Sequence, residues 1–178
     1  IGRQGRILDG RAEVYLNQMV GGRQKYILLE VELPPGRDGD ALQVASARTR
    51  YVDPLNQGRR STGGGVSVEF SRSAEAVAAS TNVGVQQAYM LNMSAMAQEK
   101  AITLSDEGKK EQAVQALQQS VESLKAAGAR YQDCVLMERA ARMESQAEAL
   151  KTKGMDKRAR KVLRTESYQL KNQQSVQP

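Results

Sequence analysis

Few side chains in this sequence have the chemistry of a catalytic or metal-binding group. Histidine is absent, which removes the commonest general base, the Ser/His and Cys/His nucleophile pairs, and His-containing metal sites. Cys134 is the only cysteine, so neither an internal disulfide nor a Cys-rich metal site can form within the chain. A single cysteine in a predicted helix more often packs than reacts.

Two pairs of acidic residues and one glycine run are the remaining candidates for chemistry. Glu30 and Glu32 would share one face of a predicted strand, a position more typical of the solvent side of a sheet, or of its contact with a partner, than of acid–base catalysis. Asp38 and Asp40 lack the further oxygen ligands of a calcium loop. The run Gly63–Gly65 precedes a predicted strand and lacks the Lys-Ser/Thr of a phosphate loop, so it indicates flexible backbone. We therefore predict no enzyme activity, no metal and no cofactor.

The net charge of +6 comes from one short stretch. Residues 1–150 carry 18 basic and 18 acidic side chains, whereas residues 151–171 carry eight basic and two acidic ones. Such a stretch could bind phosphate, an acidic protein face or anionic lipid. Nucleic acid is less favoured, because no aromatic residue apart from Tyr168 is interleaved with the cations. The candidate contacts to an anionic partner are Lys157, Arg158, Arg160, Lys161 and Arg164. The alternative is a solvated helix face near the C-terminus, where cations suit the helix dipole.

The composition changes near residue 71. Residues 1–70 hold three of the four prolines and 11 of the 15 glycines, between short alternating apolar runs. Because strands need turn residues whereas helix interiors exclude proline, this change predicts an α+β protein. Its first part would be an antiparallel sheet or partial β-sandwich, and its second an antiparallel helical hairpin or bundle. The expected organisation is a β unit at 1–70, a linker at 71–81, a helical bundle at 82–173 and a tail at 174–178.

Alternation of apolar and polar residues predicts the strands of the β unit. They are expected at 11–17, with a turn at Gly21-Gly22, and at 24–33, 41–52 and 66–70. In the third strand, strict alternation places Leu42 and Val44 on one face and Ala45 on the other. Four strands with so few aromatic residues make a thin core with open edges. Either the helical part covers this sheet, or another chain supplies the missing strands.

Apolar residues at helical spacing predict four helices, at about 82–106, 109–127, 131–153 and 156–172. The first stripe contains Met90, Met93, Ala97, Ala101 and Leu104, and methionines in such a stripe are typical of core packing more than of a partner groove. The next three stripes are Val114, Leu117, Val121 and Leu124; Leu136, Ala140, Met143, Ala147 and Leu150; and Ala159, Val162, Leu163 and Leu170. No apolar run approaches the length of a membrane span.

Three stretches carry a resemblance to a known family: GRILDGRAEVYLNQMVGGRQKYILLEVELPPG, VSVEF followed by SRSAEAVAASTN, and RKVLRTESYQLKNQQ. In order and spacing they cover most of residues 1–173. The chain resembles the C-terminal region of bacterial proteins containing a von Willebrand factor type A domain, the "Ca-activated chloride channel homologue" group. The resemblance implies β structure followed by helices, a periplasmic or cell-surface location, and a role in scaffolding or interaction.

The type A domain of that family binds metal through an Asp-x-Ser-x-Ser sequence, which does not occur in this chain. The resemblance therefore assigns adhesion, metal binding or channel activity to no residue of this chain. The chain begins at Ile1, without Met or a signal-like segment, so we expect a processed C-terminal fragment of a longer protein. The leading expectation is a non-enzymatic structural and interaction module that assembles with other chains. The alternative is a module that binds an anionic ligand through the basic C-terminal helix.

Overall fold

A computed structural model describes residues 5–16 and 25–173 of the chain. It has the predicted α+β composition, with helices and two small antiparallel sheets among these residues. The chain divides into two compact units, which are considered separately. One, the helical unit, comprises the described residues within Ile1–Leu28 and Asn82–Pro178. The other, the ribbon unit, comprises Leu29–Thr81.

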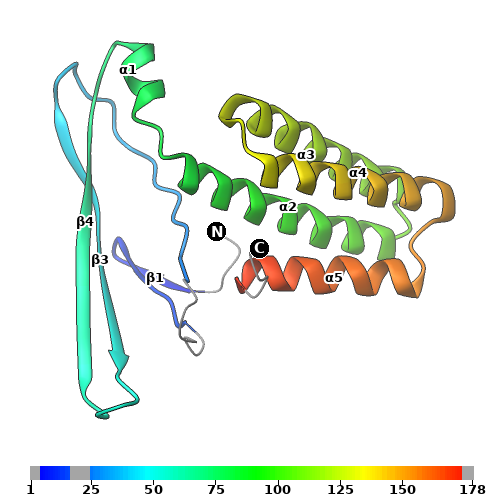
Figure 1. Cartoon of the computed structure of the whole chain (residues 1–178), viewed down its shortest axis with the longest axis horizontal. Helices are drawn as coiled ribbons and strands as arrows, with labels where there is room; N and C mark the ends of the chain where they lie inside the picture. The colour runs from blue at the N-terminus through cyan, green and yellow to red at the C-terminus, as the bar shows by residue number, and fades with distance from the viewer. Residues whose placement is uncertain (1–4, 17–24, 174–178) are drawn as a thin grey trace. The chain divides into compact units, whose positions relative to one another are not determined.

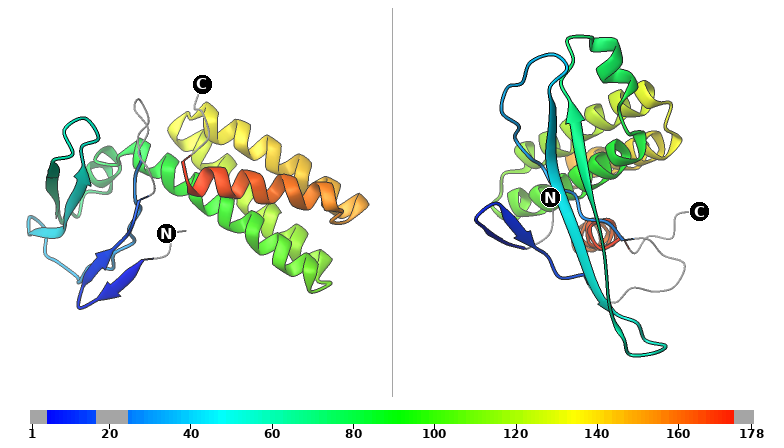
Figure 2. Two further views of the ribbon diagram at one scale, coloured as in Figure 1. Left: turned by 90° about the horizontal axis from the view of Figure 1, so that it is seen from below. Right: turned by 90° about the vertical axis from the view of Figure 1, so that its left-hand side faces the viewer.

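The helical unit is built from α2 (Val83–Asp106), α3 (Lys110–Tyr131), α4 (Cys134–Lys153) and α5 (Lys157–Lys171). Helix α2 packs against α3 on one side and α5 on the other, and α4 packs against α3 (Figure 1). The connections are two or three residues long, so successive helices run antiparallel. Figure 2 shows the same four helices alongside one another from two further directions. The expected helical bundle is therefore present.

All the buried apolar side chains in the described residues lie on α2 to α5. The predicted stripes of α3 and α4 are buried over their whole length, and the fully buried members include Leu117, Leu124, Leu136 and Met143. The stripe predicted for α2 is only partly right, because Met93 is exposed. Since α2 contacts both α3 and α5, its buried face is wider than one stripe. It contains Leu91, Asn92, Ser94, Ala95, Gln98, Ala101 and Ile102.

Local sequence explains where these helices begin and end. Asn82, Asp133 and Asp156 precede α2, α4 and α5, and each side chain accepts a hydrogen bond from a backbone N–H of the first turn. Helix α4 ends at Gly154, whose φ of 76° favours glycine. The predicted helix boundaries are therefore close to the observed ones, because capping and apolar spacing are both local signals.

The N-terminal part of the helical unit contains a short hairpin, β1 (Arg6–Leu8) paired with β2 (Arg11–Glu13). Asp9 and Gly10 both have positive φ, as a tight type I′ turn requires. Residues 25–28 then extend beside the helices. The Tyr26 N–H donates to Gln173 Oε1 at 2.9 Å and Gln173 Nε2 donates to the Tyr26 carbonyl at 2.7 Å, which ties this segment to the end of α5.

The ribbon unit is a long antiparallel pair, β3 (Ala41–Val52) and β4 (Arg59–Glu69), followed by the short helix α1 (Ala74–Ala79). A β-bulge between Gln43 and Ala45 leaves Val44 without an opposing residue on β4. At the end of the ribbon where Ala41 opposes Glu69, the ring of Phe70 packs so tightly on Gly36 that no side chain would fit there. The ribbon is therefore well ordered in its pairing, although it contains only two strands.

The strand predictions are partly right. Strand 41–52 is confirmed at its predicted bounds, whereas β4 begins seven residues before the predicted 66 and β1 was not predicted. Of the strand predicted at 11–17, Arg11–Glu13 is present as β2, and the described residues 25–33 of the predicted strand 24–33 are assigned to no strand. Helix α1 lies inside the predicted linker. Residues 17–24, with the predicted Gly21-Gly22 turn, and the predicted tail at 174–178 lie outside the described residues.

Candidate functional site

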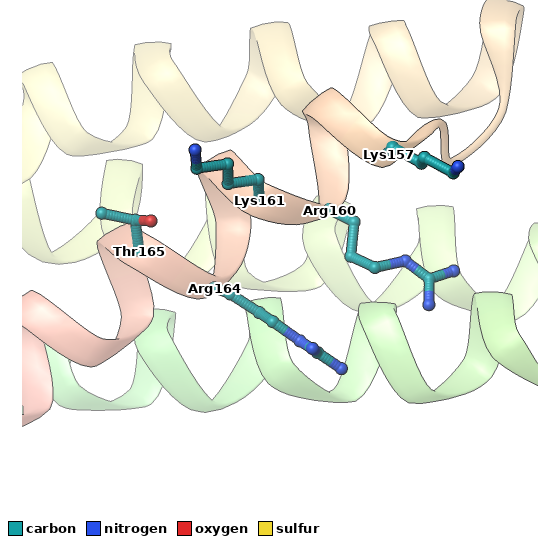
Figure 3. Close-up of a pocket in the computed structure, with 5 residues that line it drawn as sticks. All are labelled: Lys157, Arg160, Lys161, Arg164 and Thr165. Atoms are coloured by element: carbon teal, nitrogen blue, oxygen red, sulfur yellow. The ribbon is translucent and has the colours of Figure 1, made fainter.

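The basic residues of α5 form the first candidate site. Lys157, Arg160, Lys161 and Arg164 line one surface depression together with Thr165 (Figure 3). Arg158, the fifth predicted contact, is exposed but is not part of this depression. The side chains do not converge on a point: Arg160 and Arg164 extend from one side of the helix, whereas Lys161 points the other way (Figure 3).

The electrostatic setting of these cations differs from the one expected. The solvated-face alternative places these cations where they suit the helix dipole, but Lys157, Arg160 and Lys161 lie in the first turns of α5, where the helix dipole is positive. Asp156 caps this end, its Oδ1 accepting from the Ala159 N–H at 2.6 Å, and Arg160 forms an ion pair with Asp106 at the end of α2. The dipole therefore does not favour these cations, and among residues 5–16 and 25–173 neither Lys161 nor Arg164 forms an ion pair that would offset it.

A buried polar cluster between α2, α4 and α5 is the second feature with unusual electrostatics. Glu166 Oε2 accepts hydrogen bonds from Arg139 Nη1 at 2.8 Å, Gln98 Nε2 at 3.0 Å and Gln146 Nε2 at 3.0 Å. Arg139 Nε also donates to the buried Ser94 hydroxyl at 3.1 Å. Arg139 is only 7% exposed, so a charged pair lies inside the bundle.

Both partners of that pair have lowered pKa values. Burial lowers the pKa of Arg139, although the hydrogen bond and the charge of Glu166 oppose this. Burial by itself would raise the pKa of Glu166, but hydrogen bonds from Gln146, Gln98 and Arg139, with the positive charge of Arg139, lower it below its ordinary value. Glu166 is therefore held as a carboxylate that joins three helices.

This cluster is not among the predicted sites, although the sequence contains a signal for it. Arg139 lies three residues after Leu136 and four before Met143, which puts a charged side chain on the buried stripe of α4. Gln98 lies in the same way on the buried face of α2. Gln98 Oε1 and Arg139 Nη2 are buried without a hydrogen-bond partner among the described residues. A structural role is the simplest account, because the cluster opens into neither of the two depressions described for this chain.

The third candidate is the apolar face of the ribbon. Leu42 opposes Val68 and Ala45 opposes Val66, and opposed residues lie on the same face of an antiparallel pair. The face continues through Ala47 to Tyr51, whereas Gln43, Ser46, Arg48 and Arg50 lie on the other face. The bulge brings Leu42 and Ala45 onto one face, so the prediction that they lie on opposite faces is wrong.

No residue of the ribbon unit is buried, although its apolar face follows most of its length. Val66 is 54% exposed and Tyr51 is 45% exposed. A β-sheet normally buries one face against a second layer. This unit supplies no such layer of its own.

Comparison with known proteins identifies no relative. A scan against protein-family models finds no match, and searches of curated proteins and of solved structures find none either. The surfaces and contacts of the chain itself therefore carry the functional argument.

The other residues that the sequence singled out as candidates for chemistry do not lie together in one site. Asp40 Oδ2 accepts from the Arg37 N–H at 2.8 Å and stabilises a local turn, whereas Asp38 Oδ1 accepts from the Arg72 N–H at 2.7 Å and joins the segment before β3 to the segment after β4. Glu30 and Glu32 are exposed, and the strand face that they were expected to share does not exist. Cys134 is exposed at the start of α4. Gly63–Gly65, expected to be flexible backbone before a strand, lie inside β4.

Within the described ranges, no three His, Cys, Asp or Glu side chains are grouped as metal ligands would be. Over the same ranges, no helix combines the length and the apolar character needed to cross a membrane.

Proposed function

We propose that this protein is a non-enzymatic structural and interaction module whose β3–β4 ribbon binds another polypeptide chain. The observation that carries the proposal is the absence of any buried residue in Leu29–Thr81, a unit with two long strands and one apolar face. An isolated two-stranded hairpin is marginally stable in water, and further strands or a packed layer are needed to stabilise it. A partner would supply what the ribbon lacks.

Strand addition is the binding mode that the ribbon suits best. A partner strand would use the main-chain groups at an edge of the ribbon for affinity, and side chains such as Val66 and Val68 would contact its apolar residues. This mode needs no catalytic or metal-binding motif. The resemblance to the region that follows a von Willebrand factor type A domain agrees with this role, and it would place the protein in the periplasm or at the cell surface.

Site-specific photo-crosslinking in the native cells tests the proposal. A photoreactive residue at Val66 should form covalent adducts with a second polypeptide, and mass spectrometry of the adducts would identify it. Gln118, which is exposed on α3, is the matched control position and should form none. If Val66 yields only the uncrosslinked chain, the ribbon is not a binding surface and the proposal is wrong.

The cations of α5 support a second function, the binding of an anionic ligand. The observation in its favour is the single depression lined by Lys157, Arg160, Lys161 and Arg164 at the positive end of the α5 dipole. A bound anion would offset the repulsion among these charges.

A salt titration with matched variants tests this second function. The affinity for a polyphosphate probe should fall steeply as salt rises, because each contact displaces condensed or associated counterions. The double variant Lys161→Glu/Arg164→Glu should lose binding. Arg158→Glu, which reverses a charge on the same helix outside the depression, should weaken it much less. Equal losses in both variants would indicate a general effect of net charge and no defined site.

A further inference from the structure

The two edges of the ribbon differ in how open they are to another strand. Natural edge strands resist pairing through bulges, prolines and lysines. Strand β3 carries the bulge at Val44, whereas β4 is regular from Arg59 to Glu69 and contains neither proline nor lysine. Since β3 and β4 form a two-stranded sheet in the described structure, β4 has only one neighbouring strand. The outer edge of β4 is therefore the more suitable edge for strand addition.

The sequence of β4 is complementary to itself when it is reversed. Pairing two antiparallel copies about Gly64 places Arg59 opposite Glu69, Arg60 opposite Val68 and Thr62 opposite Val66. By symmetry the Arg59–Glu69 pair occurs twice, once at each end of the interface. Opposite charges directly across two strands stabilise the pairing. Glycines 63, 64 and 65 occupy the centre, so no side chain there opposes close approach.

We propose that the chain forms a two-fold symmetric dimer by antiparallel pairing of β4 with β4 of a second copy, centred on Gly64. The ribbons of two copies then make a four-stranded sheet in the order β3–β4–β4–β3. This inference rests on the proposed function and names its partner as a second copy of the chain. The interface is isologous, because each copy contributes the same residues.

Two observations favour this register over registers shifted by one or two residues. In the proposed register even-numbered residues oppose even-numbered ones, so Val66 and Val68 of both copies extend a single apolar face. A shift of one residue would oppose the apolar face of one copy to the polar face of the other. A shift of two residues keeps the apolar faces of the two copies on the same side of the sheet. In that register, however, Arg59 and Glu69 each oppose a serine or a glutamine and no longer oppose each other.

The edge of β3 offers no equivalent arrangement. Residues 41–52 contain Arg48 and Arg50 but no acidic residue, so two copies of β3 would form no cross-strand ion pair. The bulge at Val44 would also interrupt a continuous ladder. Arg59 and Glu69 also cannot pair with each other within one ribbon. Arg59 and Glu69 lie ten positions apart on one straight strand, about 34 Å at about 3.4 Å per residue.

Charge reversal and its rescue test the dimer. The wild-type chain should show a concentration-dependent monomer–dimer equilibrium in sedimentation experiments. Arg59→Glu and Glu69→Arg should each raise the dissociation constant roughly tenfold or more, because both ends then carry like charges. An equimolar mixture of the two single variants should recover association, since every cross-copy pair is again of opposite sign. The double variant Arg59→Glu/Glu69→Arg should recover it by itself.

Arg50→Glu on β3 is the matched control, because it reverses a ribbon charge away from the interface and should leave the dissociation constant unchanged. Circular dichroism of each variant confirms that the helices are intact. A chain that stays monomeric, or a dimer that is insensitive to Arg59→Glu, overturns the self-pairing. If such a monomer still forms adducts at Val66 with a different polypeptide, the interaction function stands and only the second copy as partner is wrong. If it forms none, both proposals fail.

Discussion

The helical unit and the ribbon unit both form regular backbone hydrogen bonds, but only the helical unit buries apolar side chains. Helices α2 to α5 form their backbone hydrogen bonds internally and bury Leu117, Leu124 and Leu136 completely among themselves. The ribbon pairs each strand once and buries no residue. Regular pairing is therefore not enough to make a core. The difference is the reason that the proposed binding surface lies on β3 and β4.

The largest contrast is expected between two apolar truncations. Leu117→Ala removes a side chain with no exposed surface and should lower the free energy of unfolding of the helices by about 2–5 kcal/mol. Val66→Ala shortens a side chain that is 54% exposed, and this substitution should change the free energy of unfolding by less than about 0.5 kcal/mol. Urea titrations followed at 222 nm at low protein concentration compare the two. Equal losses would mean that the ribbon is already packed in the isolated chain.

The next effect concerns the buried ion pair. Arg139→Ala leaves Glu166 without its cation and should cost about 2–3 kcal/mol, below the usual range for a buried pair because Glu166 is partly solvated. Arg142→Ala, on an exposed position of the same helix, is the control and should cost little. In a double-mutant cycle, Arg139→Ala and Glu166→Ala should lose less together than the sum of the single losses. Strict additivity would show that the two side chains do not interact.

The same cluster should give the bundle a pH dependence with a definite sign. The pKa of Glu166 is lower in the folded than in the unfolded chain, so its contribution is present above the unfolded pKa, about 4.3, and is lost as pH falls through the folded pKa. Wild type should exceed Glu166→Gln in stability by about 1–2 kcal/mol at neutral pH. Urea titrations from pH 7 to strongly acidic solution should show this difference closing. A constant difference would contradict the lowered pKa.

The smallest effect is expected at a helix cap. Asp133 accepts from the Leu136 N–H at 3.1 Å and from Gln87 Nε2 at 2.8 Å, so it both starts α4 and contacts α2. Asp133→Ala should lower the stability of the helical unit by about 1 kcal/mol. Asp133→Asn keeps an acceptor oxygen and should retain most of that stability. Thermal unfolding measures both, and a loss as large for asparagine as for alanine would indicate that the charge matters more than the cap.

The helical part of the fold was predictable to within a few residues, whereas among the predicted strands only 41–52 has its predicted bounds. The stripes of α3 and α4 follow from residues three and four apart, which one helix brings together without help from the rest of the chain. The segment 25–33 shows the limit of such reasoning. It has the composition of a strand, but the structure assigns it to no strand, and the Tyr26 backbone hydrogen-bonds with the side chain of Gln173, a residue that no local pattern connects with it.

The candidate sites also differ in how far the sequence predicted them. Four of the five predicted cations share one depression because they lie within two turns of one helix. The cluster around Glu166 was missed because Gln98, Arg139 and Glu166 are far apart in the sequence and meet only through the packing of three helices.

The sequence by itself determined the α+β composition, the positions of the four long helices and the concentration of positive charge near residue 160, since each depends on neighbours along the chain. The tertiary structure decided which face of the ribbon is apolar, because one unpaired residue, Val44, reverses the alternation of β3 relative to β4. It also decided that Glu166 would be held as a partly buried carboxylate and that the ribbon would remain uncovered within its own unit. These features depend on contacts between distant residues, and no local pattern specifies them.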